Sequence, residues 1–117
     1  MIKRNRRAAK ARTRKRRLSV RAAAHQLDSG RCVWPTCQRV VSLEFAHAHE
    51  IVWRSRGGDP CDLDNVVTLC GATHVDIHPR VGGITKKIEG SRALGLRFFE
   101  RDGDTWRRVF VAQVDGG

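Results

Sequence analysis

The sequence lacks a long apolar run and an apolar segment behind its basic N-terminus. A membrane-spanning helix needs about 20 consecutive apolar residues, and no stretch of the 117 residues approaches that length. A secretion signal needs an apolar segment after its basic residues, and none follows here. We therefore expect a soluble protein that does not use the general secretion route.

Internal repeats are also lacking, and the chain is short. A length of 117 residues favours one domain. Eleven Gly and three Pro indicate substantial loop content. A domain of this size buries a modest core and often needs a metal ion or a partner to hold its loops.

Acidic residues are missing from the N-terminal segment, so the net charge of +11 is unevenly distributed. Residues 1–17 contain ten Lys or Arg and no acid, whereas the other hundred residues carry thirteen basic and twelve acidic side chains. Such a self-repulsive segment predicts a mobile arm. Its favoured partner is nucleic acid, because each neutralised phosphate releases condensed counterions. A localisation signal, a solubilising tail and a membrane-surface patch remain open.

Local patterns predict an α+β protein. We expect a short helix over 17–27 that ends at Gly30, and a weak strand from 40 to 53. A loop at 57–60 separates it from a second strand over 65–69. One or two helical turns over 71–78 follow, halted by Pro79.

The C-terminal part predicts a β-hairpin. Strands over 96–99 and 106–111 flank a turn at 100–104. This hairpin carries no obvious chemistry, so it is either scaffold or a contact to the DNA backbone through Arg97, Arg107 and Arg108.

Four of the five histidines lie within residues 47–78. His74 and His78 are four residues apart, so a helix places them on one face, where both can bind one metal ion. His49 on the preceding strand can supply a third ligand. Three protein ligands and one open position are typical of a catalytic metal site. A His pair at this spacing alone is usually coincidence, but the clustering and the basic arm favour the metal site.

The order of these motifs resembles the HNH endonucleases, including the nuclease domains of DNase colicins and small phage and bacterial HNH proteins. The resemblance spans about residues 32–78 and includes the Gly-Gly loop, Asn65, Leu69-Cys70 and the His pair. It implies a ββα-metal core over 18–90, after a disordered basic arm over 1–17 and with 91–117 as a hairpin extension. It also implies metal ligands His49, His74 and His78, and an Asn65 that braces the loop and so orients the base.

The implied activity is hydrolysis of DNA phosphodiester bonds with low sequence specificity. The family usually has His directly before Ile51, as the general base, whereas this chain has Glu50. A carboxylate can accept a proton from water, although a nearby metal ion and arginines would lower its pKa. His47, on the same strand face as His49, is the alternative base. An inactive nucleic-acid-binding module that keeps the fold is the alternative function.

The resemblance also implies partners and cofactors. The catalytic ion would be Zn, Ni, Mn or Mg, and imidazole ligands favour Zn or Ni. The partner would be double-stranded DNA in the cytoplasm of a bacterial or phage-infected cell, with packaging or restriction as the pathway. The expected DNA contacts are basic side chains of the loop and the arm: Arg54, Arg56, Lys3, Arg4, Arg6, Arg7, Arg14, Arg16 and Arg17.

The four cysteines suggest metal ligands or free thiols rather than disulfides, because no secretion signal is present. Many HNH proteins bind a structural zinc ion with two Cys pairs. This chain offers Cys32, Cys37 and Cys70, but Thr73 stands where the fourth Cys would be. Cys61 is the spare thiol. The alternative is that these thiols simply pack in the core.

Overall fold

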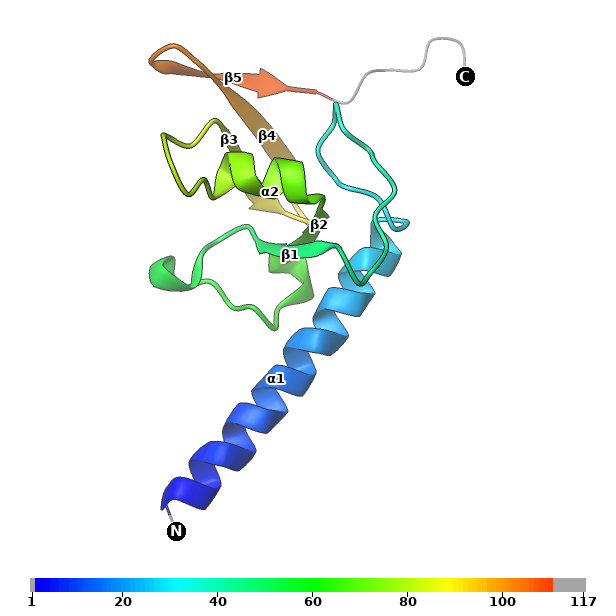
Figure 1. Cartoon of the computed structure of the whole chain (residues 1–117), viewed down its shortest axis with the longest axis vertical. Helices are drawn as coiled ribbons and strands as arrows, with labels where there is room; N and C mark the ends of the chain where they lie inside the picture. Colours follow the sequence, from blue (N-terminus) through cyan, green and yellow to red (C-terminus); the bar gives the residue numbers. More distant parts are fainter. Residues whose placement is uncertain (1, 111–117) are drawn as a thin grey trace.

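The computed structural model describes residues 2–110, with side chains from Arg6 onward. Its first element is helix α1, Ile2–Leu27, which projects from the rest of the molecule (Figure 1). The helix predicted from residue 17 begins much earlier, at Ile2, so one helix covers both that segment and the one expected to be a mobile arm. Ala, Arg and Lys are strong helix formers, and no Pro or Gly occurs before Gly30. Exposure of the basic side chains to water reduces the repulsion on which the prediction depended.

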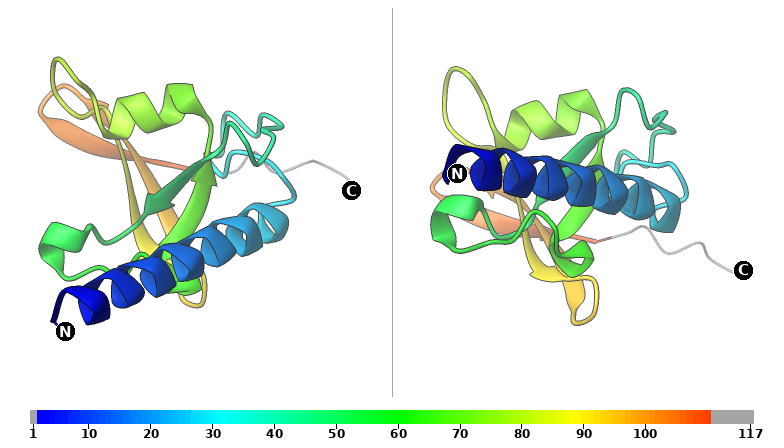
Figure 2. Two further views of the ribbon diagram at one scale, coloured as in Figure 1. Left: turned by 60° about the horizontal axis from the view of Figure 1, so that its bottom comes forward. Right: turned by 90° about the horizontal axis from the view of Figure 1, so that it is seen from below.

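Two short strands and a helix form the centre of the fold. Strands β1 (His47–Glu50) and β2 (Val66–Leu69) are antiparallel, with His49 opposite Val67. Helix α2 (Gly71–Ile77) follows β2 directly. All four residues of β2 are buried, because the C-terminal part of α1 covers the hairpin (Figure 2). The predicted second strand and the predicted helical turns are thus confirmed.

The expected strand over 40–53 is much shorter than predicted. Only His47–Glu50 is extended and paired in β1. Val40 forms an isolated bridge with Arg31, and the chain then turns, with the Ala46 amide donating to the Ser42 carbonyl at 2.9 Å. Within residues 40–45, Val41 is buried and Phe45 is exposed, and the segment forms no strand.

The loop between β1 and β2 contains two 3₁₀ turns, Arg54–Arg56 and Leu63–Asn65. Gly57 adopts a left-handed conformation with φ 88° after the first turn. The predicted break at 57–60 is therefore a reversal of the chain that brings the second turn back beside β1.

The C-terminal part is a three-stranded antiparallel sheet in the order β3-β4-β5. Strands β4 (Gly95–Asp102) and β5 (Thr105–Val109) form the predicted hairpin with a tighter turn than expected. Strand β3 (Lys86–Ser91) was not predicted, because two lysines and Gly90 give it little strand character. Pairing with β4 supplies its stability. Val111, the last residue of the expected strand, lies outside the described residues.

Buried contacts join the sheet to the centre of the fold. The Trp34 and Phe98 rings meet edge to face at 5.4 Å, and Trp34 is fully buried. Asp28, at the end of α1, accepts two hydrogen bonds from Arg92 at 2.8 Å and one from the Thr68 amide at 2.9 Å. The result is an α+β fold with two helices and two antiparallel sheets in the described residues. No helix of residues 2–110 has the length and apolar character needed to cross a membrane.

Candidate functional site

A cleft of about 310 Å³ lies between β1 and α2 and contains three of the predicted metal ligands. Strand β1 supplies His49, which is 3% exposed. Helix α2 supplies His74, and His78 caps its C-terminus. The ring centre of His78 lies 5.3 Å from that of His49 and 5.1 Å from that of His74. We call this the histidine cleft, and its other lining residues are Ala48, Glu50, Trp53, Arg54 and Ser55.

Burial favours the neutral forms of His49 and His74. Desolvation, followed by repulsion from His78 and His74, lowers the pKa of His49 from 6.5 to about 4. Desolvation also lowers the pKa of His74, with further contributions from His47 and His78. A neutral imidazole offers a nitrogen lone pair, so the donors suit an ion such as Zn or Ni. Their ring nitrogens do not all come within 4.8 Å of one another, so shared binding requires side-chain rotation.

The two candidate bases differ in position. Glu50 lines the histidine cleft, and Arg54 Nε donates to its Oε1 at 2.7 Å. Oε2 has no hydrogen-bond partner within the described part of the chain. His47 is exposed and does not line the cleft; its ring stacks on His74 with centres 4.4 Å apart. Glu50 is therefore the base candidate with direct access to the cleft.

Asn65 holds the loop closed. Its Oδ1 accepts from the Val52 amide at 2.7 Å, and its Nδ2 donates to the carbonyls of Val52 at 3.0 Å and Asp59 at 3.3 Å. Gly58 packs so tightly on the loop that an added Cβ would lie 1.7 Å from the Val52 oxygen. Asn65 is thus hydrogen-bonded to the loop at both Val52 and Asp59.

The aromatic side chain in this site was missed by sequence reasoning. Trp53 lies with its ring centre 4.8 Å from that of His78, and the Arg56 guanidinium lies 5.5 Å above the Trp53 ring. The sequence feature that could have identified Trp53 as a site residue was its position in the loop, two residues after Ile51. Arg54 lines the histidine cleft, whereas Arg56 lines a neighbouring cavity of about 410 Å³ between the loop and the C-terminal sheet.

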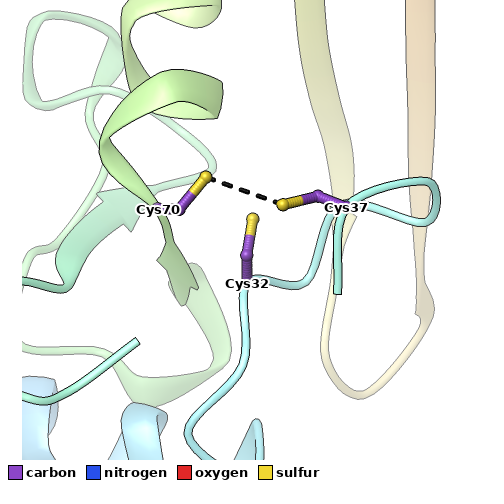
Figure 3. Close-up of side chains that lie close together, drawn as sticks. All are labelled: Cys32, Cys37 and Cys70. Carbon is purple, nitrogen blue, oxygen red and sulfur yellow. Dashed lines mark hydrogen bonds between the residues drawn. The ribbon is translucent and has the colours of Figure 1, made fainter. Parts of the chain in front are cut away.

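Three cysteines form a second group, whose Sγ atoms all lie within 4.8 Å of one another (Figure 3). Cys32 and Cys37 come from one turn, and Cys70 comes from the N-terminus of α2; the Sγ atoms of Cys37 and Cys70 are 3.7 Å apart. All four cysteines are free in the structure. We call Cys32, Cys37 and Cys70 the cysteine group, and it can hold a metal ion.

Thr73 occupies the fourth side of the cysteine group. Its Oγ1 accepts from the thiols of Cys70 at 3.4 Å and Cys32 at 3.6 Å. Cys61 lies elsewhere, with its thiol 3.9 Å from the Thr13 carbonyl oxygen, so it does not complete the group. Burial raises the pKa of Cys32. Burial also opposes ionisation of Cys70, but hydrogen bonds from Thr73, Cys37 and Cys32 outweigh it and lower its pKa to about 7.

The predicted DNA contacts of the arm lie along α1. Arg6, Arg7, Arg14 and Arg16 are exposed, and Arg17 is half-buried. The side chains of Lys3 and Arg4 lie outside the described residues. In the sheet, Arg107 pairs with Glu100 at 3.2 Å and Arg97 with Glu89 at 3.8 Å.

Comparison of the chain with protein-family models, with curated proteins and with solved structures gave no match.

Proposed function

We propose that this chain is a divalent-metal-dependent endonuclease of the HNH type that hydrolyses DNA phosphodiester bonds. The observation that carries the proposal is the histidine cleft, in which three imidazoles and the carboxylate of Glu50 line one cavity. This combination provides a metal site and a proton acceptor beside each other, as metal-assisted hydrolysis requires.

His49, His74 and His78 would hold the ion, which supplies Lewis-acid stabilisation of the charge that develops on the phosphate. Burial at 3% exposure and the lowered pKa keep His49 in the ligand form at neutral pH. Strand β1 pairs with the buried strand β2, and helix α2 buries Thr73 and Ile77, so both elements are rigid supports for the ligands.

Glu50 would act as the general base. Arg54 engages its Oε1, which leaves Oε2 to accept a proton from a water molecule. The water oxygen then bonds to phosphorus, the bond from phosphorus to the 3′ oxygen breaks, and that oxygen takes a proton from solvent. Glu50 afterwards returns its proton to solvent. His47 is the substitute base. It precedes Ala48 in β1, and Ala48 lines the cleft.

The first test is nicking of supercoiled plasmid with EDTA, Mg, Mn, Ni and Zn in parallel. We expect metal-dependent nicking that His74→Ala and His78→Ala abolish. The matched control is Val75→Ala, an exposed residue on the same helix, which should nick like the wild type. Equal nicking by His74→Ala would place the chemistry elsewhere.

A second test separates the two bases. Glu50→Gln keeps the size of the side chain and removes the proton acceptor, so nicking should fall at least about a hundredfold, in the range of general-base catalysis. His47→Gln should retain most of the rate. The reverse order of effects would make His47 the base.

The alternative function is a nucleic-acid-binding module without catalysis. Its support is the Glu50–Arg54 ion pair, which occupies one carboxylate oxygen, and the separation of the three ring nitrogens. A folded protein that binds duplex DNA, but nicks it with none of the metals, would establish this alternative.

A further inference from the structure

A second cavity, of about 270 Å³, lies between α1 and the other side of β1. Successive residues of a strand point to opposite faces, so Ala48 and Glu50 face this cavity whereas His47 and His49 face α2. Figure 2 shows α1 running alongside the hairpin that forms the other wall. We call this cavity the arginine pocket, because Arg14, Arg17, Arg21 and Arg54 all line it.

The charges of the arginine pocket are not balanced within it. Four guanidinium groups face one carboxylate, Glu50. Arg54 is paired with Glu50 at 2.7 Å, and Arg21 donates to main-chain carbonyls, including that of Ala46 at 2.9 Å. Arg14 and Arg17 have no ion-pair or hydrogen-bond partner among residues 6–110. The pocket therefore has an excess of positive charge.

Arg17 is the most informative of these residues. Its Nε is buried, yet it has no hydrogen-bond partner within the described residues. A buried charged donor without an acceptor is unfavourable. An oxyanion in the pocket would supply that acceptor, and guanidinium groups bind phosphate oxygens in a matching planar geometry.

We propose that the arginine pocket binds a backbone phosphate of the nucleic-acid strand, with Arg17 as its central contact. The proposal rests on the proposed function for the identity of the strand. Leu18 and Val66 add apolar surface, which suits the sugar attached to the phosphate and strengthens the ionic contact by excluding water. The volume lies below the roughly 300–1,000 Å³ of pockets for whole small molecules.

The arginine pocket adjoins the histidine cleft. Ala48, Glu50 and Arg54 line both cavities, so the ion pair of Glu50 with Arg54 forms part of the wall between them. A nucleic-acid strand with one phosphate in the arginine pocket would place another of its phosphates in the histidine cleft. Arg17 is thus a positioning residue for the scissile bond, and its contact reads no base sequence.

The test compares two neighbouring arginines of α1. Arg17→Gln and Arg16→Gln remove the same charge, but Arg16 is exposed and does not line the pocket. Binding of a labelled 20-base-pair duplex is measured by fluorescence anisotropy in EDTA over a series of salt concentrations. We expect Arg17→Gln to weaken binding at least about tenfold, as loss of a charge-assisted contact should, and Arg16→Gln to weaken it less than about threefold.

Equal weakening by both variants would overturn the proposal, because it would show that α1 acts only as a diffuse positive charge. Circular dichroism of both variants verifies that α1 is intact. A second measurement is the thermal unfolding of wild type and Arg17→Gln with and without inorganic phosphate. If phosphate stabilises only the wild type, and Arg17→Gln binds duplex DNA normally, the pocket binds free phosphate. That result would overturn the nucleic-acid assignment.

The outcome is independent of cleavage, because binding is measured without metal. An Arg17-specific loss of binding in a protein that never nicks DNA would support the arginine pocket and sink the nuclease proposal. Metal-dependent nicking, together with equal weakening of duplex binding by Arg17→Gln and Arg16→Gln, would support the nuclease proposal and overturn the arginine pocket.

Discussion

Asn65 bonds both main-chain polar groups of Val52, accepting from its amide at 2.7 Å and donating to its carbonyl at 3.0 Å. These two bonds close the loop between β1 and β2, and Asn65 is only 9% exposed. The loop carries Trp53 and Arg54, both of which line the histidine cleft. Asn65 therefore controls the shape of the cleft from outside it.

Replacing Asn65 should destabilise the protein and impair the cleft. Asn65→Ala leaves the Val52 amide without its acceptor, so we expect the free energy of unfolding to fall by about 2 kcal/mol. Urea unfolding measures this change. Ser55→Ala, at an exposed position of the same loop, is the control and should stay within about 0.5 kcal/mol of the wild type. Equal stabilities of the two variants would show that Asn65 does not brace the loop.

Gly58 should tolerate no side chain. In Gly58→Ala the new Cβ would lie 1.7 Å from the Val52 oxygen and 2.5 Å from its carbon, so the backbone must move. We expect a loss of roughly 2 kcal/mol or more in thermal or urea unfolding. Gly83→Ala is the matched control, because an added Cβ there meets nothing within 4 Å. A Gly58→Ala variant as stable as Gly83→Ala would contradict the packing described for the loop.

Thr73→Cys should complete the cysteine group. A thiolate in place of the Thr73 hydroxyl makes a four-sulfur tetrahedral site, so zinc affinity should rise at least about tenfold. Competition with a chromophoric chelator measures the affinity, in a background carrying His74→Ala and His78→Ala to silence the histidine cleft. Cys61→Ser should have no effect, because its thiol lies outside the group. Zinc binding that survives Cys70→Ser would show that the cysteine group is not the site.

His49 should make stability depend on pH. Its pKa is about 4 in the folded protein against 6.5 in the unfolded chain, so below pH 6.5 the unfolded chain binds the proton first. The contribution of neutral His49 to the free energy of unfolding is fully present above pH 6.5. It is lost as the pH falls toward 4, and the total loss is about 3 kcal/mol. His74 acts in the same direction, so the test compares wild type with His49→Asn.

Urea unfolding in EDTA between pH 7.5 and 4.5 provides that comparison. Between pH 6.5 and 4.5, the free energy of unfolding of the wild type should fall more steeply with pH than that of His49→Asn. The difference in slope corresponds to the uptake of up to one additional proton on unfolding. Parallel curves would mean that His49 titrates normally and is not buried as described.

Local patterns in the sequence were sufficient for part of this protein. Four-residue spacing brought the ring of His74, in α2, close to that of His78 at the helix C-cap, and the β-prone run ending at Leu69 formed β2. The order of Cys32, Cys37, Cys70 and Thr73 anticipated a cysteine group with a hydroxyl in the fourth position. The histidine spacing and the strand depend on residues close in sequence, so the chain itself encodes them. The cysteine group joins residues far apart in the chain, and the family resemblance anticipated it.

Tertiary structure decided the rest. Strand β3 is stable because it pairs with β4, and its own residues carry little strand preference. Charge alone suggested a mobile arm, whereas α1 is helical from Ile2 and runs beside the hairpin. Nothing in the sequence separates Arg17 from Arg16; only the approach of α1 to β1 buries one and leaves the other exposed. The sequence alone determined which residues could do chemistry, and long-range packing decided which of them share a cavity, because burial and pairing depend on partners distant along the chain.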